Sequence, residues 1–355
     1  MRKYYTRACN FYYGLQAQTL IKKKFALPLC GNKNIAFDYI EILSRDKKKT
    51  QLINIKKIKN LRNQLKKVIL NDLKKITSKR QNLSKNLKFF EPLIMGVLNL
   101  TPDSFSDGGL YKQSKKAFSH IKDMVDKGAN IIDVGGESTR PGSKDVSHKN
   151  EWKRLEKVII NFKKKYPKIF LSIDTRKSEI MMKGIKNKSD LINDVSGFNY
   201  DENAIEKIKK FNVWKVLHHM QGTPNTMQIN PKYKNVLLDI YDFFEEKINK
   251  GFKKFKYKKF IIDPGIGFGK NLKHNLILMN KISLFHSLGF PLLIGTSRKR
   301  FIHQISGSFD SKERIGGTLA SVLYNLLQGV QIFRVHNVNE VKQGILVFKK
   351  IISIK

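Results

Sequence analysis

Eight short apolar runs, each followed at once by small or polar residues, constrain the fold of this chain more than any other feature. Runs that are apolar throughout are typical of strands buried on both faces, as in a parallel sheet. They are PLIMGVLNLT, ANIIDVGGES, IFLSIDT, LINDVSG, WKVLHHM, FIIDPG, PLLIGTS and QIFRVH, which end near Asn99, Gly135, Asp174, Asp194, Met220, Asp263, Ser297 and His336.

Most of the segments between these runs have the spacing of amphipathic helices. In AFSHIKDMVDKG, for example, Phe118, Ile121, Met124 and Val125 fall on one face, and Gly128 ends the pattern. Buried strands that alternate with such helices predict a parallel sheet covered by helices. Eight repeats in about 265 residues match the size of a (β/α)8 TIM barrel, so the predicted fold class is α/β.

The composition fits a globular protein and gives little sign of a metal or disulfide site. Of 355 residues, 41% are hydrophobic and 10% aromatic, which is enough for one large core or two modest ones. Cys9 and Cys30 lack metal-ligand spacing, so a zinc site or a disulfide framework is not expected. The adjacent His218 and His219 are expected to be satisfied core or loop histidines. No run approaches the roughly 20 apolar residues of a membrane span, so we expect a soluble cytoplasmic protein.

The formal net charge of +40 has two interpretations. Dense cations favour polyanions such as nucleic acid through counterion release. Lysine is nevertheless spread over nearly every segment together with asparagine and isoleucine, which indicates a bias towards A/T-rich codons rather than one basic patch. No specific nucleic-acid partner is predicted, although a basic surface would help to attract an anionic substrate.

The predicted barrel explains why polar clusters follow the strands. Active sites of such barrels are built from the C-terminal ends of the strands and the loops after them. The loop in GGESTRPGS, 135–143, offers Ser138, Thr139 and Arg140 as donors for an anion or a carboxylate. The cluster LNLTPDSFSDGG, 98–109, is longer than a simple turn requires, and long loops are usually functional.

Charged residues at the other strand ends have both structural and functional interpretations. Asp174 and Asp263 each follow an Ile-rich run and could be helix N-caps or site carboxylates. Lys299 in TSRKR could belong to a solvated charge run, but it follows a buried strand. Arg334 and His336 stand two residues apart on the last strand, so both are expected on the same side.

These motifs, taken in order, resemble the dihydropteroate synthase family, a group of pterin-binding barrel enzymes. The resemblance covers about residues 91–355 through MGVLNLTPDSFSDGG, IIDVGGESTRPGS, SIDTRK, INDVSG, HMQGTP, DPGIGFGKN, GTSRKRFI and RVHNV. It implies a Mg²⁺-assisted transferase of folate biosynthesis and sensitivity to sulfonamides. The implied reaction condenses 6-hydroxymethyl-7,8-dihydropterin pyrophosphate with p-aminobenzoate, giving 7,8-dihydropteroate and pyrophosphate through a pterin-methyl cation.

The resemblance also implies site residues. The catalytic residues are Asp174, Lys299, Arg334 and His336. The pterin pyrophosphate would be bound by Thr139, Asp174, Asn193, Asp263, Lys299, Arg334, Val335 and His336. The p-aminobenzoate would be bound by Phe105, Arg140, Pro141, Phe268 and Ser297, with Lys299 near its carboxylate, and Mg²⁺ would be held through Asn99.

The segment before the barrel has no recognised function. Residues 1–50 are predicted to form a small accessory segment of unknown role, 51–90 a basic amphipathic helical linker, and 91–355 the barrel. Packing of the linker against the barrel is favoured over contact with a membrane or nucleic acid. Because the first acidic residue is Asp38, a mitochondrial transit peptide is an alternative, but the segment is poor in serine.

Two other functions fit parts of the sequence. A pterin-dependent methyltransferase would share the barrel and the pterin-binding acids, but it would not need the two long loops or the SRK and RVH motifs. A polyanion-binding protein would explain only the charge. We expect small-molecule substrates and a homodimer.

Overall fold

The eight predicted strands form a parallel barrel. The computed structural model describes the chain except residues 1, 47–49, 102–109, 139–141, 144 and 355. The strands hydrogen-bond in the order β10-β9-β8-β7-β6-β5-β12-β11, and a bridge between Ile262 and Leu292 joins the two ends. They are β5 (Leu93–Asn99), β6 (Ile131–Gly135), β7 (Phe170–Asp174), β8 (Leu191–Asp194), β9 (Trp214–His218), β10 (Phe260–Asp263), β11 (Leu293–Ile294) and β12 (Ile332–Val335).

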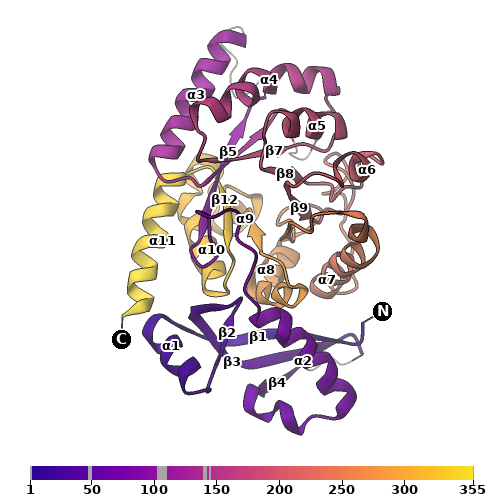
Figure 1. Cartoon of the computed structure of the whole chain (residues 1–355), viewed down its shortest axis with the longest axis vertical. Helices are drawn as coiled ribbons and strands as arrows, with labels where there is room; N and C mark the ends of the chain where they lie inside the picture. The colour runs from indigo at the N-terminus through magenta and orange to yellow at the C-terminus, as the bar shows by residue number, and fades with distance from the viewer. Residues whose placement is uncertain (1, 47–49, 102–109, 139–141, 144, 355) are drawn as a thin grey trace.

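Helices cover the outside of the barrel, as the alternating pattern predicts (Figure 1). Their apolar faces pack on the strands in one continuous core, which confirms the (β/α)8 fold. They are α3 (Leu110–Asp126), α4 (His148–Lys165), α5 (Ser178–Lys186), α6 (Ala204–Ile208), α7 (Val236–Glu246), α8 (Leu272–Asn280), α9 (Arg300–Ser306), α10 (Ile315–Leu327) and α11 (Val338–Ser353). Among the described helices, none has the length and apolarity needed to cross a membrane.

Residues 4–77 form a separate layer, the N-terminal module. Its antiparallel strands are β1 (Tyr4–Tyr13), β2 (Leu27–Leu29), β3 (Asn32–Ser44) and β4 (Gln51–Asn54), with helices α1 (Gly14–Lys22) and α2 (Asn63–Thr77). The segment predicted as a helical linker differs in its first part, where 51–54 pairs with β3 and 55–60 is a 3-10 helix. An apolar spacing alone did not reveal that Ile53 and Ile58 complete the core of this sheet.

The segment that joins the module to β5 closes one end of the barrel. Leu83 and Phe89 pack against Leu93, Trp214 and other residues at the N-terminal ends of the strands. The Trp214 indole Nε1 donates a hydrogen bond to the Leu83 carbonyl at 3.0 Å. This segment between α2 and β5, called the linker from here on, therefore closes the N-terminal end of the barrel. The opposite, C-terminal end remains open to a functional site.

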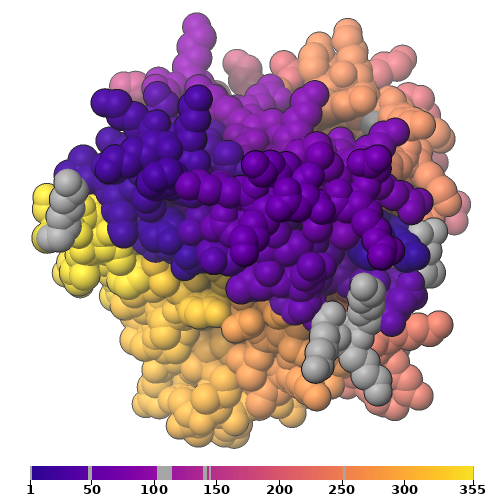
Figure 2. All heavy atoms as spheres, turned by 90° about the horizontal axis from the view of Figure 1, so that it is seen from below, coloured from indigo at the N-terminus to yellow at the C-terminus, as the bar shows by residue number. Residues whose placement is uncertain are grey.

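The module is held beneath the barrel by polar contacts as well as by packing. Figure 2 shows it spread across this end of the molecule. Arg45 donates to Asp239 and Asp242 of α7, each at 2.7 Å. The Tyr13 hydroxyl donates to the Leu327 carbonyl at 2.7 Å, next to the C-terminus of α10. Contacts near both ends of β1 thus fix the module to the barrel.

Candidate active site

A charged network crosses the C-terminal end of the barrel. Arg334 of β12 donates from Nε to Asp133 Oδ2 and from Nη2 to Asp174 Oδ2, both at 2.7 Å. Asn193, at the end of β8, donates from Nδ2 to the same oxygen of Asp133 at 3.0 Å. Two predicted site residues, Asn193 and Arg334, thus share the buried carboxylate of Asp133, and Arg334 connects a third, Asp174, to it.

The network keeps Asp174 difficult to ionise. Burial is the largest cause, and although Arg334 opposes it, repulsion from Asp133 adds to it, so that the pKa of Asp174 is raised to about 7. The two carboxylates raise the pKa of Arg334 against the effect of its own burial. A strongly shifted carboxyl group in a concave, polar site is typical of functional positions.

Asp263 and Lys299 form a second charged group beside this network. Burial raises the pKa of Asp263 to about 6, although the backbone amide of Gly265 donates to its Oδ1 at 2.8 Å. Burial, together with the charge of Arg334, lowers the pKa of Lys299 to about 8. The Lys299 Nζ lies 4.1 Å from the centre of the Phe268 ring, a cation–π geometry.

The glycines of the loop DPGIGFGK, 263–270, determine its backbone conformation. At Gly265 the backbone φ is +70°, and a Cβ there would lie 2.0 Å from the His219 carbonyl oxygen. Buried Lys270 ties the loop to β9 by hydrogen bonds from its Nζ to His219 Nδ1 at 3.0 Å and to the Phe268 carbonyl at 2.8 Å. The loop presents Phe268, whose ring meets the edge of His218 at 4.6 Å. Both histidines are buried and hydrogen-bonded, as expected for satisfied core or loop histidines.

The remaining described site residues surround the same space. Ser297 Oγ contacts the backbone nitrogen of His336 at 3.2 Å and its Nδ1 at 3.1 Å. A Cβ on Gly135 would lie 3.6 Å from both Asn99 Oδ1 and Asp174 Oδ2, so these oxygens face one position. The side chain of Val335 packs in the core, which leaves only its backbone for a ligand.

Four predicted site residues, Phe105, Thr139, Arg140 and Pro141, lie outside the described part of the chain and remain predictions. The structure does show which residues hold the start of the loop in GGESTRPGS, 135–143. Glu137 accepts hydrogen bonds from Lys177 Nζ at 2.9 Å, from Arg176 Nη2 at 2.9 Å and from the amide of Val146 at 3.0 Å.

Sequence reasoning missed Asp133, which organises the network. Besides Arg334 and Asn193, its carboxylate binds the hydroxyl of Ser172 and is fully buried. The signal was present, because an aspartate in the middle of the apolar run IIDVGG must find partners inside the barrel. Arg176 was not assigned to the chemistry, and it supports the loop 135–143 through Glu137.

Taken together, the fold and the site define a barrel enzyme. The site combines carboxylate and amide groups suited to a donor-rich heterocycle with cations suited to an anion. Residues 95–336 match the family described as pterin binding enzyme.

The relatives are dihydropteroate synthases. That of Escherichia coli K12 is 39% identical over 274 residues, covering 76% of this chain and 95% of its own, and that of Neisseria meningitidis serogroup B is 41% identical over 269 residues, covering 73% and 92%. The Yersinia pestis enzyme, solved with a sulfonamide drug, superposes with a TM-score of 0.71 at 36% identity over 76% of this chain and 98% of that one. The chain therefore belongs to the dihydropteroate synthase family, transferases of folate biosynthesis.

Proposed function

We propose that this chain performs the family reaction through a dissociative step at the site described above. The pterin pyrophosphate would lose pyrophosphate to leave a pterin-methyl cation, which the p-aminobenzoate amine then attacks. The observation that carries the proposal is the Asp133–Arg334–Asp174 network, which places one cation and two carboxylates around one position. A solved relative from Xanthomonas albilineans, 29% identical with a TM-score of 0.68, holds 7,8-dihydropteroate.

The amino edge of the pterin would be hydrogen-bonded by Asp174, Asn193 and Asp263. These side chains lie at or near the C-terminal ends of β7, β8 and β10, and carboxylate and amide oxygens accept hydrogen bonds from amino and ring N–H groups. Lys299 would donate to the pterin carbonyl and ring nitrogen from the opposite side. Burial of Asp174 and Asp263 supports this role, because a hydrogen bond from a ligand to a buried carboxylate is stronger than one made in water.

Arg334 and His336 would hold the pyrophosphate, assisted by Thr139. Arg334 offers a planar set of donors, and Ser297 fixes the orientation of the His336 ring. The described residues contain no cluster of three or more His, Cys, Asp or Glu side chains that could hold a metal. Mg²⁺ would therefore be bound by the oxygen of Asn99 and by the substrate phosphates, as this ion commonly is. When bound, Mg²⁺ neutralises charge on the leaving pyrophosphate.

Asp174 would stabilise the pterin-methyl cation through its negative charge. Its carboxylate faces the position between Asn99 and Gly135, and Arg334 holds it there through one hydrogen bond. The neutral arylamine can attack a cation without a strong general base. Its ring would pack on Phe268, with Ser297, Arg140 and Lys299 near its carboxylate, and Phe105 and Pro141 covering the other side.

An assay of pyrophosphate release tests this proposal. Release should require both the pterin pyrophosphate and p-aminobenzoate, and 7,8-dihydropteroate should appear in equal amount. Release that is independent of p-aminobenzoate would contradict the condensation, and transfer of a methyl group from a pterin would favour the alternative barrel function. We also propose a cytoplasmic homodimer, which sedimentation of the purified chain would test.

A further inference from the structure

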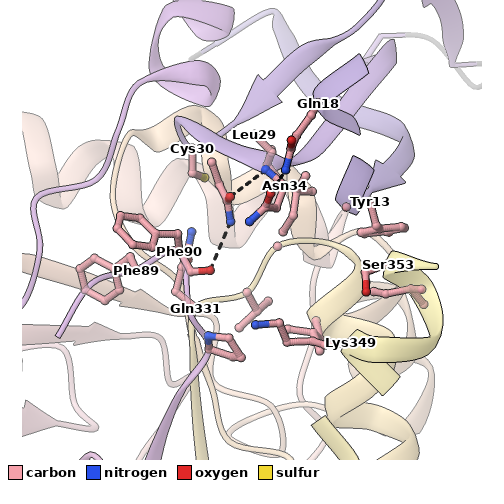
Figure 3. Close-up of a pocket in the computed structure, with 18 of the residues that line it drawn as sticks. Tyr13, Gln18, Leu29, Cys30, Asn34, Phe89, Phe90, Gln331, Lys349 and Ser353 are labelled. Carbon is pink, nitrogen blue, oxygen red and sulfur yellow. Dashed lines mark hydrogen bonds between the residues drawn. The ribbon is translucent and has the colours of Figure 1, made fainter. Parts of the chain in front are cut away.

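A cavity lies at the other end of the barrel, between the N-terminal module, the segment before β5 and α11. It has a volume of about 490 Å³ and is walled by apolar side chains that include Leu29, Phe89, Phe90 and Val330. Figure 3 shows it bounded by the module, by the linker before β5 and by α11. This volume is in the range of small-molecule sites. The substrates described above have no use for it, because the network that binds them lies at the C-terminal ends of the strands.

A cysteine lines this cavity and is paired with a histidine. Cys30 stands in the turn between β2 and β3, is partly exposed, and has its Sγ 3.3 Å from Nδ1 of buried His286. The Nε2 of His286 lies 2.8 Å from the Gln328 carbonyl, which can only accept a hydrogen bond. Nε2 therefore carries the proton of the neutral ring, which leaves Nδ1 as an acceptor for the thiol.

This arrangement gives Cys30 a base and gives that base a fixed orientation. A nucleophile, a base within hydrogen-bonding distance and a third group that orients the base are the elements of an activated thiol. Arg80, also buried, donates from Nη2 to the His286 carbonyl at 2.9 Å, so a guanidinium is held beside the pair. We propose that Cys30 and His286 form a nucleophilic thiol site that takes small disulfides bearing carboxylates from this cavity.

The charged groups around Cys30 favour the thiolate. Burial acts against ionisation, but Arg80, His286 and the side chain of Gln331 together lower the pKa of Cys30 to about 7. Lys349 and Lys350 of α11 line the same cavity, and Lys349 is paired with Glu91. Carboxylates on the ligand would be attracted by these lysines and by the net charge of +40.

The reaction is a thiol–disulfide exchange. His286 Nδ1 accepts the thiol proton, and the Cys30 thiolate attacks one sulfur of the incoming disulfide. The disulfide bond of the ligand breaks, a mixed disulfide with Cys30 forms, and the second sulfur leaves as a thiolate that can take up the proton. No other oxidant or reductant is needed.

The chain contains its own control. Cys9 is buried in β1, where burial raises the pKa of its thiol, and it does not line the cavity. At pH 7 a thiol of pKa about 7 is roughly fifty times more ionised than one of pKa about 9. Its lower nucleophilicity removes about a factor of ten of this gain, so Cys30 should react about fivefold faster than an ordinary cysteine.

The test uses the full native chain and dithiobis(nitrobenzoate), an aromatic disulfide that carries carboxylates. We expect one fast equivalent with a pH midpoint near 7, about fivefold faster at pH 7 than a peptide spanning residues 26–34. Cys30→Ser should lose the fast phase and Cys9→Ser should keep it. His286→Gln should move the midpoint towards the ordinary thiol value. Lys350→Gln should slow the acidic reagent but not the neutral dithiodipyridine.

Several results would overturn the proposal. Faster reaction at Cys9, a rate at Cys30 no higher than in the peptide, or a midpoint near 9 would show that the thiol is not activated. An unchanged midpoint in folded His286→Gln would remove the dyad. Equal slowing of both reagents by Lys350→Gln would remove the preference for carboxylates. The wild-type profile and the Cys9→Ser result decide the matter even if the histidine variant does not fold.

Discussion

Replacement of Asp174 by asparagine should abolish activity while making the protein more stable at alkaline pH. Asparagine has the volume and hydrogen-bonding capacity of the protonated acid and cannot ionise. Asp174 is 7% exposed, and the amide oxygen of an asparagine in its place could still accept the hydrogen bond that Arg334 donates to the carboxylate at 2.7 Å. Arg334 also keeps its second partner, Asp133. The substitution therefore removes a charge and leaves the packing intact.

The size and sign of the effect follow from the shifted pKa. The folded pKa of Asp174 is about 7 and its ordinary value is 3.8, a rise of about three units. Because the folded state holds the proton more tightly, ionisation costs stability, and the cost grows as the pH rises from about 4 to 7. Above pH 7 it reaches about 4 kcal/mol, since one unit corresponds to about 1.4 kcal/mol. At about pH 4.5 it should have fallen to about 1 kcal/mol.

Thermal unfolding of the wild type and of Asp174→Asn at about pH 8 and pH 4.5 measures this difference. The variant should melt up to roughly 8 °C higher at pH 8, with the gap narrowing at pH 4.5. Asp201→Asn is a control of opposite sign. Although burial acts against it, hydrogen bonds from the Ser178 and Asn203 amides lower the pKa of Asp201. Its charge therefore stabilises the fold above the unfolded pKa, and its loss should lower the melting temperature at pH 8.

Two results would refute this reasoning. If Asp174→Asn melts below the wild type at pH 8, the ion pair with Arg334 contributes more than burial of the charge costs, and the pKa of Asp174 is not raised. If the purified variant keeps full activity, the carboxylate neither reads the pterin nor stabilises the cation.

Three further predictions concern the ligands. Asp263→Asn should lose most activity. In the wild type, log kcat/KM should fall below about pH 6, the pKa of Asp263, and above about pH 8, the pKa of Lys299. A flat profile over this range would contradict the roles of both residues. Magnesium pyrophosphate should raise the melting temperature of the wild type but not of Arg334→Ala, and an equal rise in both would count against the pyrophosphate site. A sulfonamide should bind in calorimetric titrations only with magnesium pyrophosphate present, if Phe105 and Pro141 complete the p-aminobenzoate site only around that anion. Equal affinity without it would mean a preformed site.

The sequence predicted the barrel well because its strands are mostly apolar on both faces. Runs such as FIIDPG and QIFRVH have no exposed face, so their burial needed no knowledge of neighbours. The N-terminal module was harder to predict. Leu52, in β4, and Ile55 and Ile58, in the 3-10 helix, recur every three residues and so fit a helical period, and only pairing of 51–54 with β3 decides against one continuous helix.

The site was predictable where residues act at strand ends and unpredictable where they act through others. Asp174 and Arg334 were singled out from their positions and Asn193 through the family resemblance, whereas Asp133 was passed over because it lies in the middle of the apolar run of β6, before the strand end. The pairing of Cys30 with His286 joins residues 256 positions apart and depends on how the module docks. No local pattern contains that information.

The two ends of the barrel differ in the side chains that fill them. At the C-terminal end Asp174, Asp263 and Lys299 have pKa values between about 6 and 8, all shifted mainly by burial. Groups shifted in this way are destabilising without a ligand, and a pterin pyrophosphate that supplies donors and an anion would offset part of the cost. At the other end Leu83 and Phe89 fill the bottom of the barrel with apolar contacts. The linker that joins the module to the barrel therefore contributes stability at the end where the chemistry makes no demand on it.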